Sequence, residues 1–321
     1  MIFKRPFFWV ILAVSALFAV LPLKGNNVDL REGLILGAVS IILATNLNLM
    51  IGYTGYVNFG NIVSYGLGGY IGVYLVATRG WPLVAAAVAA GVAVSLFTLL
   101  LGLAILHLRG AYFALATIGV LEAMKAFVSN FGPWGKAAGI YLPFDVYQSL
   151  GGPMQALWTT YFLVIVVMGL SLLLSYVIKT SKFGLGLFAI REDEDAALVL
   201  GVRTSLYKAM IYGISSFFPA VTGAFIFFKS GTIEPVQAFD LTLSIEAIVM
   251  MMLGGQGTVT GAALGAFLYE ELRGYLLTSP ALSNFHMVIA GGLLLLIVLF
   301  APAGLMGWVY RSVPRLRRYL E

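Results

Sequence analysis

The sequence predicts an all-α polytopic membrane protein with about ten transmembrane helices. Hydrophobic residues make up 60% of its 321 residues, whereas Asp, Glu, Lys and Arg make up only 10%. Soluble globular proteins carry about 25% charged residues, so this composition does not suit a large soluble core. The apolar runs are long and continuous instead of alternating with period two, which favours spanning helices over the strands of a membrane β-barrel.

Ten apolar runs follow one another, separated by short polar or glycine-rich links. Lys4 and Arg5 precede the first run, a pattern that signal peptides and first membrane helices share. No small-residue cleavage site follows, so a helix that stays in the protein is favoured. The runs cover residues 7–23, 33–51, 62–77, 83–106, 111–128, 157–178, 209–228, 241–253, 262–277 and 287–300.

Positive charge is distributed as expected if both termini lie in the cytoplasm. With ten spans, the N-terminus, the turn at 107–110, the segment 179–208 and the C-terminal tail share one side and hold 12 of the 19 Lys and Arg residues. Cytoplasmic segments of membrane proteins carry such an excess. The Gly- and Pro-rich segment 130–155 is then predicted to be an extracytoplasmic loop in a single domain, 1–321.

The sequence offers little to an enzyme or an ion-coupled carrier. It contains no cysteine and two widely separated histidines, and it lacks metal-ligand spacing, a nucleophile motif and a phosphate-binding loop, so no metal or cofactor is expected. Charges within the runs are functional candidates by default, but they form no ladder suited to proton relay. The candidates are Glu122, Lys125, Glu246, Glu270, Glu271 and Arg273. A channel or secondary transporter is therefore the alternative of a different class, and a membrane scaffold without transport is a third.

Two glycine-rich breaks interrupt the apolar pattern and resemble each other. Corresponding breaks in two halves of a transporter mark its pathway, because irregular backbone at membrane depth must line a cavity or be buried in protein. The sequence thus predicts a weak internal repeat, and lining of a pathway and simple packing both stay open. The candidate pathway residues are Gly52, Tyr53, Thr54, Gly55, Asn58, Asn61, Gly254, Gly255, Gln256 and Gly257. Gly60, Ser64, Gly68 and Gly72 recur every four residues, which predicts a helix ridge for close packing.

Segment 179–208 holds nine of the 33 charged residues. Acidic residues before Ala196 and a glycine at 201 predict a short helix over 193–200. Phe183, Leu187 and Ile190 share one face of a preceding helix and are expected to need an apolar partner. Two interpretations stay open, a connector on the lipid headgroups and a docking platform for a cytoplasmic motor.

The chain resembles, over nearly its whole length, the LivM-type permease subunits of branched-chain amino-acid ABC importers. The order and spacing of several segments carry this resemblance: residues 47–72, 106–114, 181–201, 243–246, 253–265 and 302–307. It implies a second LivH-type permease subunit, two cytoplasmic ABC ATPase subunits that hydrolyse ATP, and an extracytoplasmic substrate-binding protein. Asn58 and Asn61 stand where relatives often have Ser and His, so urea, short amides or aromatic acids are alternative substrates.

The resemblance also implies that the segment after the sixth run couples to an ATPase, which favours the docking platform. The residues expected to carry this coupling are Phe183, Leu187, Ile190, Arg191, Glu192, Asp193, Glu194, Asp195, Ala197, Leu198 and Gly201. The leading hypothesis is thus a multi-pass permease subunit of a bacterial or archaeal plasma (inner) membrane importer, itself not an enzyme.

Overall fold

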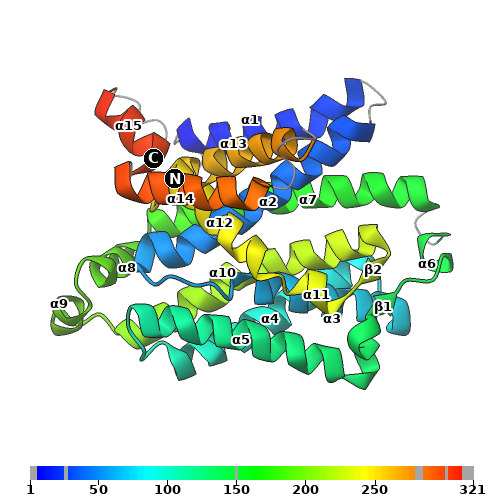
Figure 1. The fold of residues 1–321 in the computed structure, drawn as a ribbon, viewed down its shortest axis with the longest axis horizontal. Coiled ribbons are helices and arrows are strands. Elements are labelled where there is room, and N and C mark those ends of the chain that lie inside the picture. The colour runs from blue at the N-terminus through cyan, green and yellow to red at the C-terminus, as the bar shows by residue number, and fades with distance from the viewer. Residues whose placement is uncertain (1–5, 25–27, 149–150, 279–284, 301–302, 313–321) are drawn as a thin grey trace.

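The structure, a computed structural model, describes residues 6–24, 28–148, 151–278, 285–300 and 303–312. Within these residues, a helix occupies each of the ten predicted apolar runs. Figure 1 shows most of them running along the long axis of the molecule. The long helices are α1 (Pro6–Val20), α2 (Val28–Thr54), α3 (Asn61–Arg79), α4 (Leu83–Ile105), α5 (Ala111–Asn130), α7 (Pro153–Lys179), α10 (Thr204–Ser230), α12 (Leu241–Gly254), α13 (Val259–Thr278) and α14 (His286–Phe300).

Six helical segments are long and apolar enough to cross a membrane, judged by length and composition in the described residues. They lie at 30–54, 83–105, 111–130, 153–179, 204–230 and 235–254. Helices bond all their backbone groups internally, which is the requirement that a hydrocarbon environment imposes. The chain is therefore a multi-pass helical membrane protein.

The short elements gather at the two ends of the bundle. Helices α8 (Lys182–Glu192), α9 (Glu194–Val199) and α15 (Gly304–Ser312) lie at one end, and α6 (Asp145–Gln148) lies at the other (Figure 1). Near α6, strands β1 (Ile140–Tyr141) and β2 (Thr232–Ile233) pair antiparallel, with Ile140 opposite Ile233. Helix α11 (Pro235–Ala238) follows β2. The charged segment and the Gly- and Pro-rich segment thus lie at opposite ends.

The Gly- and Pro-rich segment is more ordered and shorter than the sequence predicts. It contains 3-10 turns at Gly132–Trp134 and Lys136–Ala138, besides β1 and α6. Helix α7 already begins at Pro153, whereas the sixth run was predicted from residue 157. Proline suits the first position of a helix because its missing N–H would have no intrahelical partner there.

Helix α2 forms the centre of the bundle and is almost entirely buried, whereas α4 and α5 expose most of their apolar surface. A helix that is apolar on all sides suits such a central position. Several of its polar residues find partners on neighbouring helices: Asn46 Nδ2, for example, donates to Ser171 Oγ on α7 at 2.7 Å. The apolar surface of α4 and α5 is left for lipid or for another subunit.

Gly68 and Gly72 of the predicted ridge pack against α10, whereas Gly60 lies just before α3 and against Thr117 of α5. A Cβ atom at Gly68 would lie 2.2 Å from the backbone oxygen of Ala220, and one at Gly72 would lie 2.4 Å from Ala224 Cβ. Membrane helices associate through such close approach because lipid provides no hydrophobic driving force between them. The packing interpretation of this ridge is confirmed.

We expect Gly68→Ala to lower the free energy of unfolding by about 2–3 kcal/mol, because the added methyl group forces two backbones apart. Tryptophan fluorescence during thermal unfolding in detergent measures the change. Gly119→Ala on α5 is the control, since its Cβ would have no atom within 4 Å. Equal melting temperatures for the two variants would contradict the packing role.

Candidate functional site

The charged segment forms two capped helices at one end of the bundle. The Ser181 hydroxyl accepts from Gly184 N at 3.0 Å where α8 begins. Asp193 caps α9, because its Oδ1 accepts from Asp195 N at 2.9 Å and from Ala196 N at 3.0 Å. Gly201 follows α9 with φ +88°, a conformation that favours glycine. The two predicted helices are confirmed, with Asp193 as a cap instead of a helix residue.

The apolar face of α8 turns into the protein. Leu187 and Ile190 are 0% and 3% exposed. Phe183 is half-buried, and its ring packs against that of Tyr207 with centroids 5.0 Å apart. The expectation that this face needs an external partner is wrong for Leu187 and Ile190. The bundle itself covers them, because α8 folds back against α2, α7 and α10.

Besides Leu185 of α8, the strongly exposed apolar residues of this segment lie at the tip of α9. Ala197 is buried, whereas Leu198, Val199 and Leu200 are 58%, 87% and 82% exposed. Three adjacent exposed aliphatic side chains beside a charged helix are typical of a surface that another protein covers. Val199 and Leu200 were not among the predicted coupling residues. The apolar end of the Ala-Ala-Leu-Val-Leu run is the sequence signal that could have identified them.

A buried lysine fastens α9 to the bundle. Lys208, on α10, is 1% exposed, and its Nζ lies 2.6 Å from Glu194 Oε1. The same nitrogen donates to the Leu106 carbonyl at 2.7 Å and to Tyr56 Oη at 3.0 Å. It also lies 4.4 Å from the centroid of the Tyr56 ring. A buried ammonium needs this number of partners, because burial of an unpaired charge is costly.

Arg109, in the turn after α4, adds a second charged contact. Its guanidinium bonds both carboxylate oxygens of Asp195, at 2.8 and 3.0 Å, and its Nε lies 3.8 Å from Glu194 Oε2. Burial disfavours the Glu194 anion. The hydrogen bonds from Lys208 and Tyr56 and the nearby positive charges outweigh that effect and hold its pKa below the ordinary value. Hydrogen bonding to Arg109 likewise lowers the pKa of Asp195, so both carboxylates are ionised at neutral pH.

The two glycine breaks, far apart in sequence, meet in space. Asn48, on α2, bridges them: its Oδ1 accepts from Gly257 N at 2.7 Å and its Nδ2 donates to the Thr258 carbonyl at 3.0 Å. A Cβ atom at Gly52 would lie 2.6 Å from Gly257 N. We call this contact the glycine junction, formed by Asn48, Gly52 and residues 255–258.

Helix α8 is joined to the glycine junction through Arg191. Its Nη1 donates to the Gly52 carbonyl at 2.6 Å, and a Cβ atom at Gly257 would lie 2.8 Å from the same nitrogen. The ring of Tyr53 packs against that of Phe188 on α8, with centroids 4.8 Å apart and the ring planes tilted by 41°. A displacement of α8 would therefore reach both breaks directly.

The structure shifts the limits of both breaks. Helix α2 continues to Thr54, so Gly52, Tyr53 and Thr54 are helical, and the first break begins at Gly55 with φ +78°. The second begins at Gly255, with φ +122°. Most of the predicted pathway residues are buried within the chain: Gly52, Tyr53, Thr54, Asn58, Asn61, Gly254, Gly255 and Gly257. Gly55 is exposed and Gln256 is half-buried.

Charged side chains of α12 and α13 form a separate cluster in which one arginine pairs with two glutamates. Arg273 of α13 lies 3.3 Å from Glu246 of α12 and 3.2 Å from Glu270 one turn away. Ser40 of α2 donates to Glu270 at 2.8 Å. Glu271, by contrast, is exposed. In the part of the chain that the structure describes, no three acidic or histidine side chains gather as a metal site would require.

Sequence reasoning missed Asn48, Tyr56, Arg109 and Lys208 as site residues. Asn46 and Asn48 were visible as two amides within an apolar run, a signal for a buried hydrogen-bond partner. Lys208 lay inside the charged segment. Its role depends on Tyr56 and Leu106, which are distant in sequence, so only the fold reveals it.

Comparison with known proteins places these features in a family. The permease protein LivM of the high-affinity branched-chain amino acid transport system of Escherichia coli (strain K12) is 26% identical over 94% of this chain and 75% of its own length. LivH of the same organism is 28% identical over 86% of this chain and 94% of its own. The ribose import permease protein RbsC of Bacillus subtilis (strain 168) is 27% identical over 46% of this chain and 51% of its own.

No solved structure matches the chain. The model of the family described as branched-chain amino acid transport system / permease component matches residues 30–298, which is most of the sequence. That match includes α2, both glycine breaks and the charged segment. The chain belongs to this family of transport permease components.

Proposed function

We propose that the chain is a permease subunit of an ATP-driven importer of branched-chain amino acids. The names of its LivM and LivH relatives support this substrate class. The partners we propose are a LivH-type permease, two cytoplasmic ABC ATPases that hydrolyse the ATP, and an extracytoplasmic binding protein. In this proposal the chain itself catalyses no reaction and acts by changing its conformation.

The single observation that carries the proposal is the construction of segment 179–208. Lys208 and Arg109 fix α9 to the bundle through Glu194 and Asp195, yet Leu198, Val199 and Leu200 point away from it. A rigidly attached helix with an apolar tip suits the transmission of force from a docked ATPase. The remaining proposed coupling residues would support the tip of α9 from the side of the bundle: Phe183, Leu187, Ile190, Arg191, Glu192, Asp193, Ala197 and Gly201.

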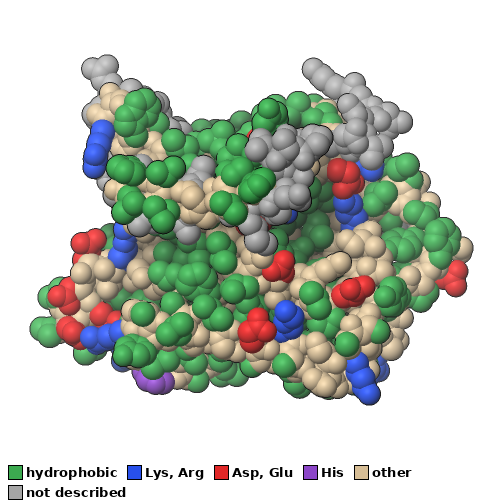
Figure 2. Space-filling model, viewed as in Figure 1, with side chains coloured by type: hydrophobic (Ala, Val, Ile, Leu, Met, Phe, Trp, Pro, Cys, Tyr) green, Lys and Arg blue, Asp and Glu red, His purple; other side chains and the backbone are tan. Residues whose placement is uncertain are grey.

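We further propose that force on α8 reaches the pathway at the glycine junction, through the bond from Arg191 to Gly52. The predicted pathway residues would then shape the cytoplasmic end of the pathway by moving, since most of them are buried. Figure 2 shows a face hollowed between α5 and the helices above it in the view, with hydrophobic side chains on its floor. A sister permease facing this hollow would complete a passage suited to apolar substrates.

The proposed topology has ten spans in one domain, 1–321, with both termini and segment 179–208 in the cytoplasm and segment 130–155 outside. The start of α1 and helix α15 lie at the same end as α8 and α9, which supports it (Figure 1). The positive charges that the sequence places at this end also agree with the positive-inside rule.

Reconstitution in liposomes tests the function. The complete importer, with its binding protein, should accumulate labelled leucine, isoleucine or valine only when ATP is supplied inside. Urea, a short amide and an aromatic acid are the alternative substrates to compare, and preference for one of them would replace the substrate class. Uptake by the isolated chain without ATP would overturn the importer in favour of a channel or carrier.

Val199→Asp should reduce the amount of ATPase that purifies with the chain about tenfold, because a carboxylate at the tip must be desolvated when the ATPase docks. Val236→Asp is the matched control, since that valine is 66% exposed near the opposite end. Equal recovery of ATPase with the two variants would rule out docking at the tip of α9.

Arg191→Leu should leave ATPase recovery unchanged and reduce ATP-driven uptake about tenfold, because α8 loses a charge-assisted bond to Gly52. Lys182→Leu, an exposed change on the same helix, provides the comparison. If uptake is the same in both variants, Arg191 does not transmit the motion.

Lys208→Met should lower the free energy of unfolding by about 3 kcal/mol, because Glu194 loses its closest cation. Adding Glu194→Gln should restore part of that loss, since it removes the uncompensated charge. Thermal unfolding of the two single variants and the double variant measures this coupling. A double variant whose loss equals the sum of the two single losses would show that the pair does not act together.

A further inference from the structure

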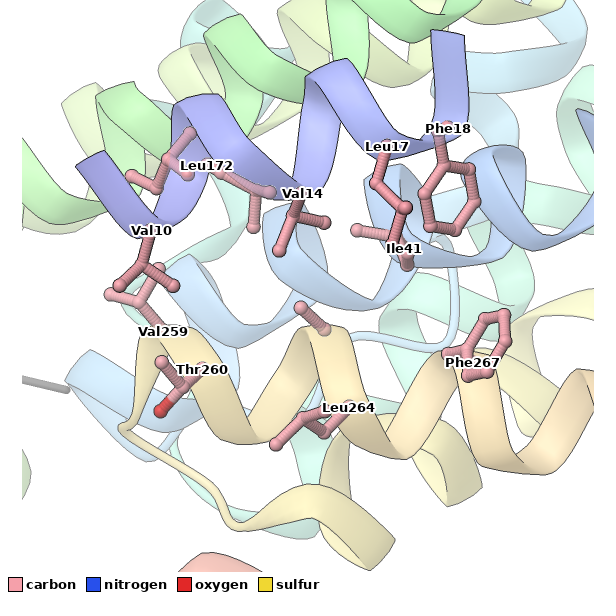
Figure 3. Close-up of a pocket in the computed structure, with 12 residues that line it drawn as sticks. Val10, Val14, Leu17, Phe18, Ile41, Leu172, Val259, Thr260, Leu264 and Phe267 are labelled. Atoms are coloured by element: carbon pink, nitrogen blue, oxygen red, sulfur yellow. The ribbon is translucent and has the colours of Figure 1, made fainter. Parts of the chain in front are cut away.

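An apolar cavity of about 330 Å³ lies beneath α1, where that helix packs over α2, α7 and α13 (Figure 3). Its lining is apolar apart from Thr260. The cavity is lined by Val10, Ile11, Val14, Leu17, Phe18, Ile41, Leu172, Val259, Thr260, Ala263, Leu264 and Phe267.

The cavity opens towards the outside of the bundle beside α1. Leu17 of α1 and Leu264 of α13 are 56% and 48% exposed. Ile41 and Leu172 form the inner wall and are 3% and 4% exposed. With α1 and α13 spanning the membrane, as in the proposed topology, the opening meets lipid hydrocarbon.

The two ends of the cavity differ in chemistry. At one end, the rings of Phe18 and Phe267 meet edge to face, with centroids 6.0 Å apart, and close it (Figure 3). At the other end, the Thr260 hydroxyl lies 3.3 Å from Tyr310 Oη on α15. The next residue on α15, Arg311, is exposed. An elongated apolar molecule with one polar end would fit this order of groups.

We propose that this cavity binds one acyl chain of a membrane phospholipid, with its methyl end at Phe18 and Phe267 and its phosphate beside Tyr310 and Arg311. Apolar cavities of about 150 Å³ stay dry and accept a benzene ring, so this one has room for roughly ten methylene groups. An empty void loses dispersion contacts in proportion to its size, which favours a filled cavity. Tyrosine and arginine suit the headgroup level.

The test uses the full chain in liposomes that contain a phosphatidylglycerol with a diazirine near the end of one acyl chain. After illumination, peptide mass spectrometry locates the labelled residues. We expect label on Ile41, which lipid surrounding the protein cannot reach because it is buried. Label confined to exposed residues outside the cavity, such as Leu96 and Leu100 of α4, would overturn the proposal, and this outcome requires no variant.

Variants that fill the cavity sharpen the result. Ala263→Phe should reduce label on Ile41 at least tenfold and leave label on Leu96 of α4 unchanged. Ala85→Phe, which adds the same volume at an exposed position of α4, is the matched control. Val14→Phe fills the cavity from the α1 side and serves if Ala263→Phe does not assemble. Undiminished label in the filled variants, or label that disappears when the sister permease binds, would assign the cavity to another role.

Discussion

The close approach of two backbones at the glycine junction is the constraint on which the rest of the structure depends. Asn48 satisfies Gly257 N and the Thr258 carbonyl, and no side chain fits between Gly52 and Gly257. This contact joins the end of the central helix α2 to the turn between α12 and α13. Arg191 then attaches α8 to the same point. One small region thus connects the core of the bundle to its charged end.

A second constraint acts a short distance away, where Lys208 is buried beside Glu194. An ammonium with 2% of its side chain exposed must be paired, so α9 is held in one position relative to α10 and Tyr56. The apolar tip of α9 is therefore presented rigidly. Together with the link from α8 to the glycine junction, this contact connects the charged end of the bundle to its core.

The outer surface of the bundle is packed differently. Helices α4 and α5 expose apolar surface, and α1 packs loosely enough to leave a cavity beneath it. In the hydrocarbon environment, these surfaces gain little by packing against the protein, since lipid is equally apolar. Close packing is found instead where small residues allow backbone contact, as between α3 and α10.

Composition and charge pattern by themselves determined that the chain is an all-α membrane protein, because twenty apolar residues in a row admit few other structures. Local signals also placed α8, α9 and the packing ridge at Gly68, since terminal acidic residues, a following glycine and four-residue spacing depend only on near neighbours. Tertiary structure decided which faces are covered. It buried Leu187 and Ile190, exposed Val199 and Leu200, and joined Asn48 to Gly257 and Lys208 to Glu194 and Tyr56. Contacts between residues so distant in sequence, as Asn48 and Gly257 are, arise from the packing of whole helices, and no local pattern encodes them.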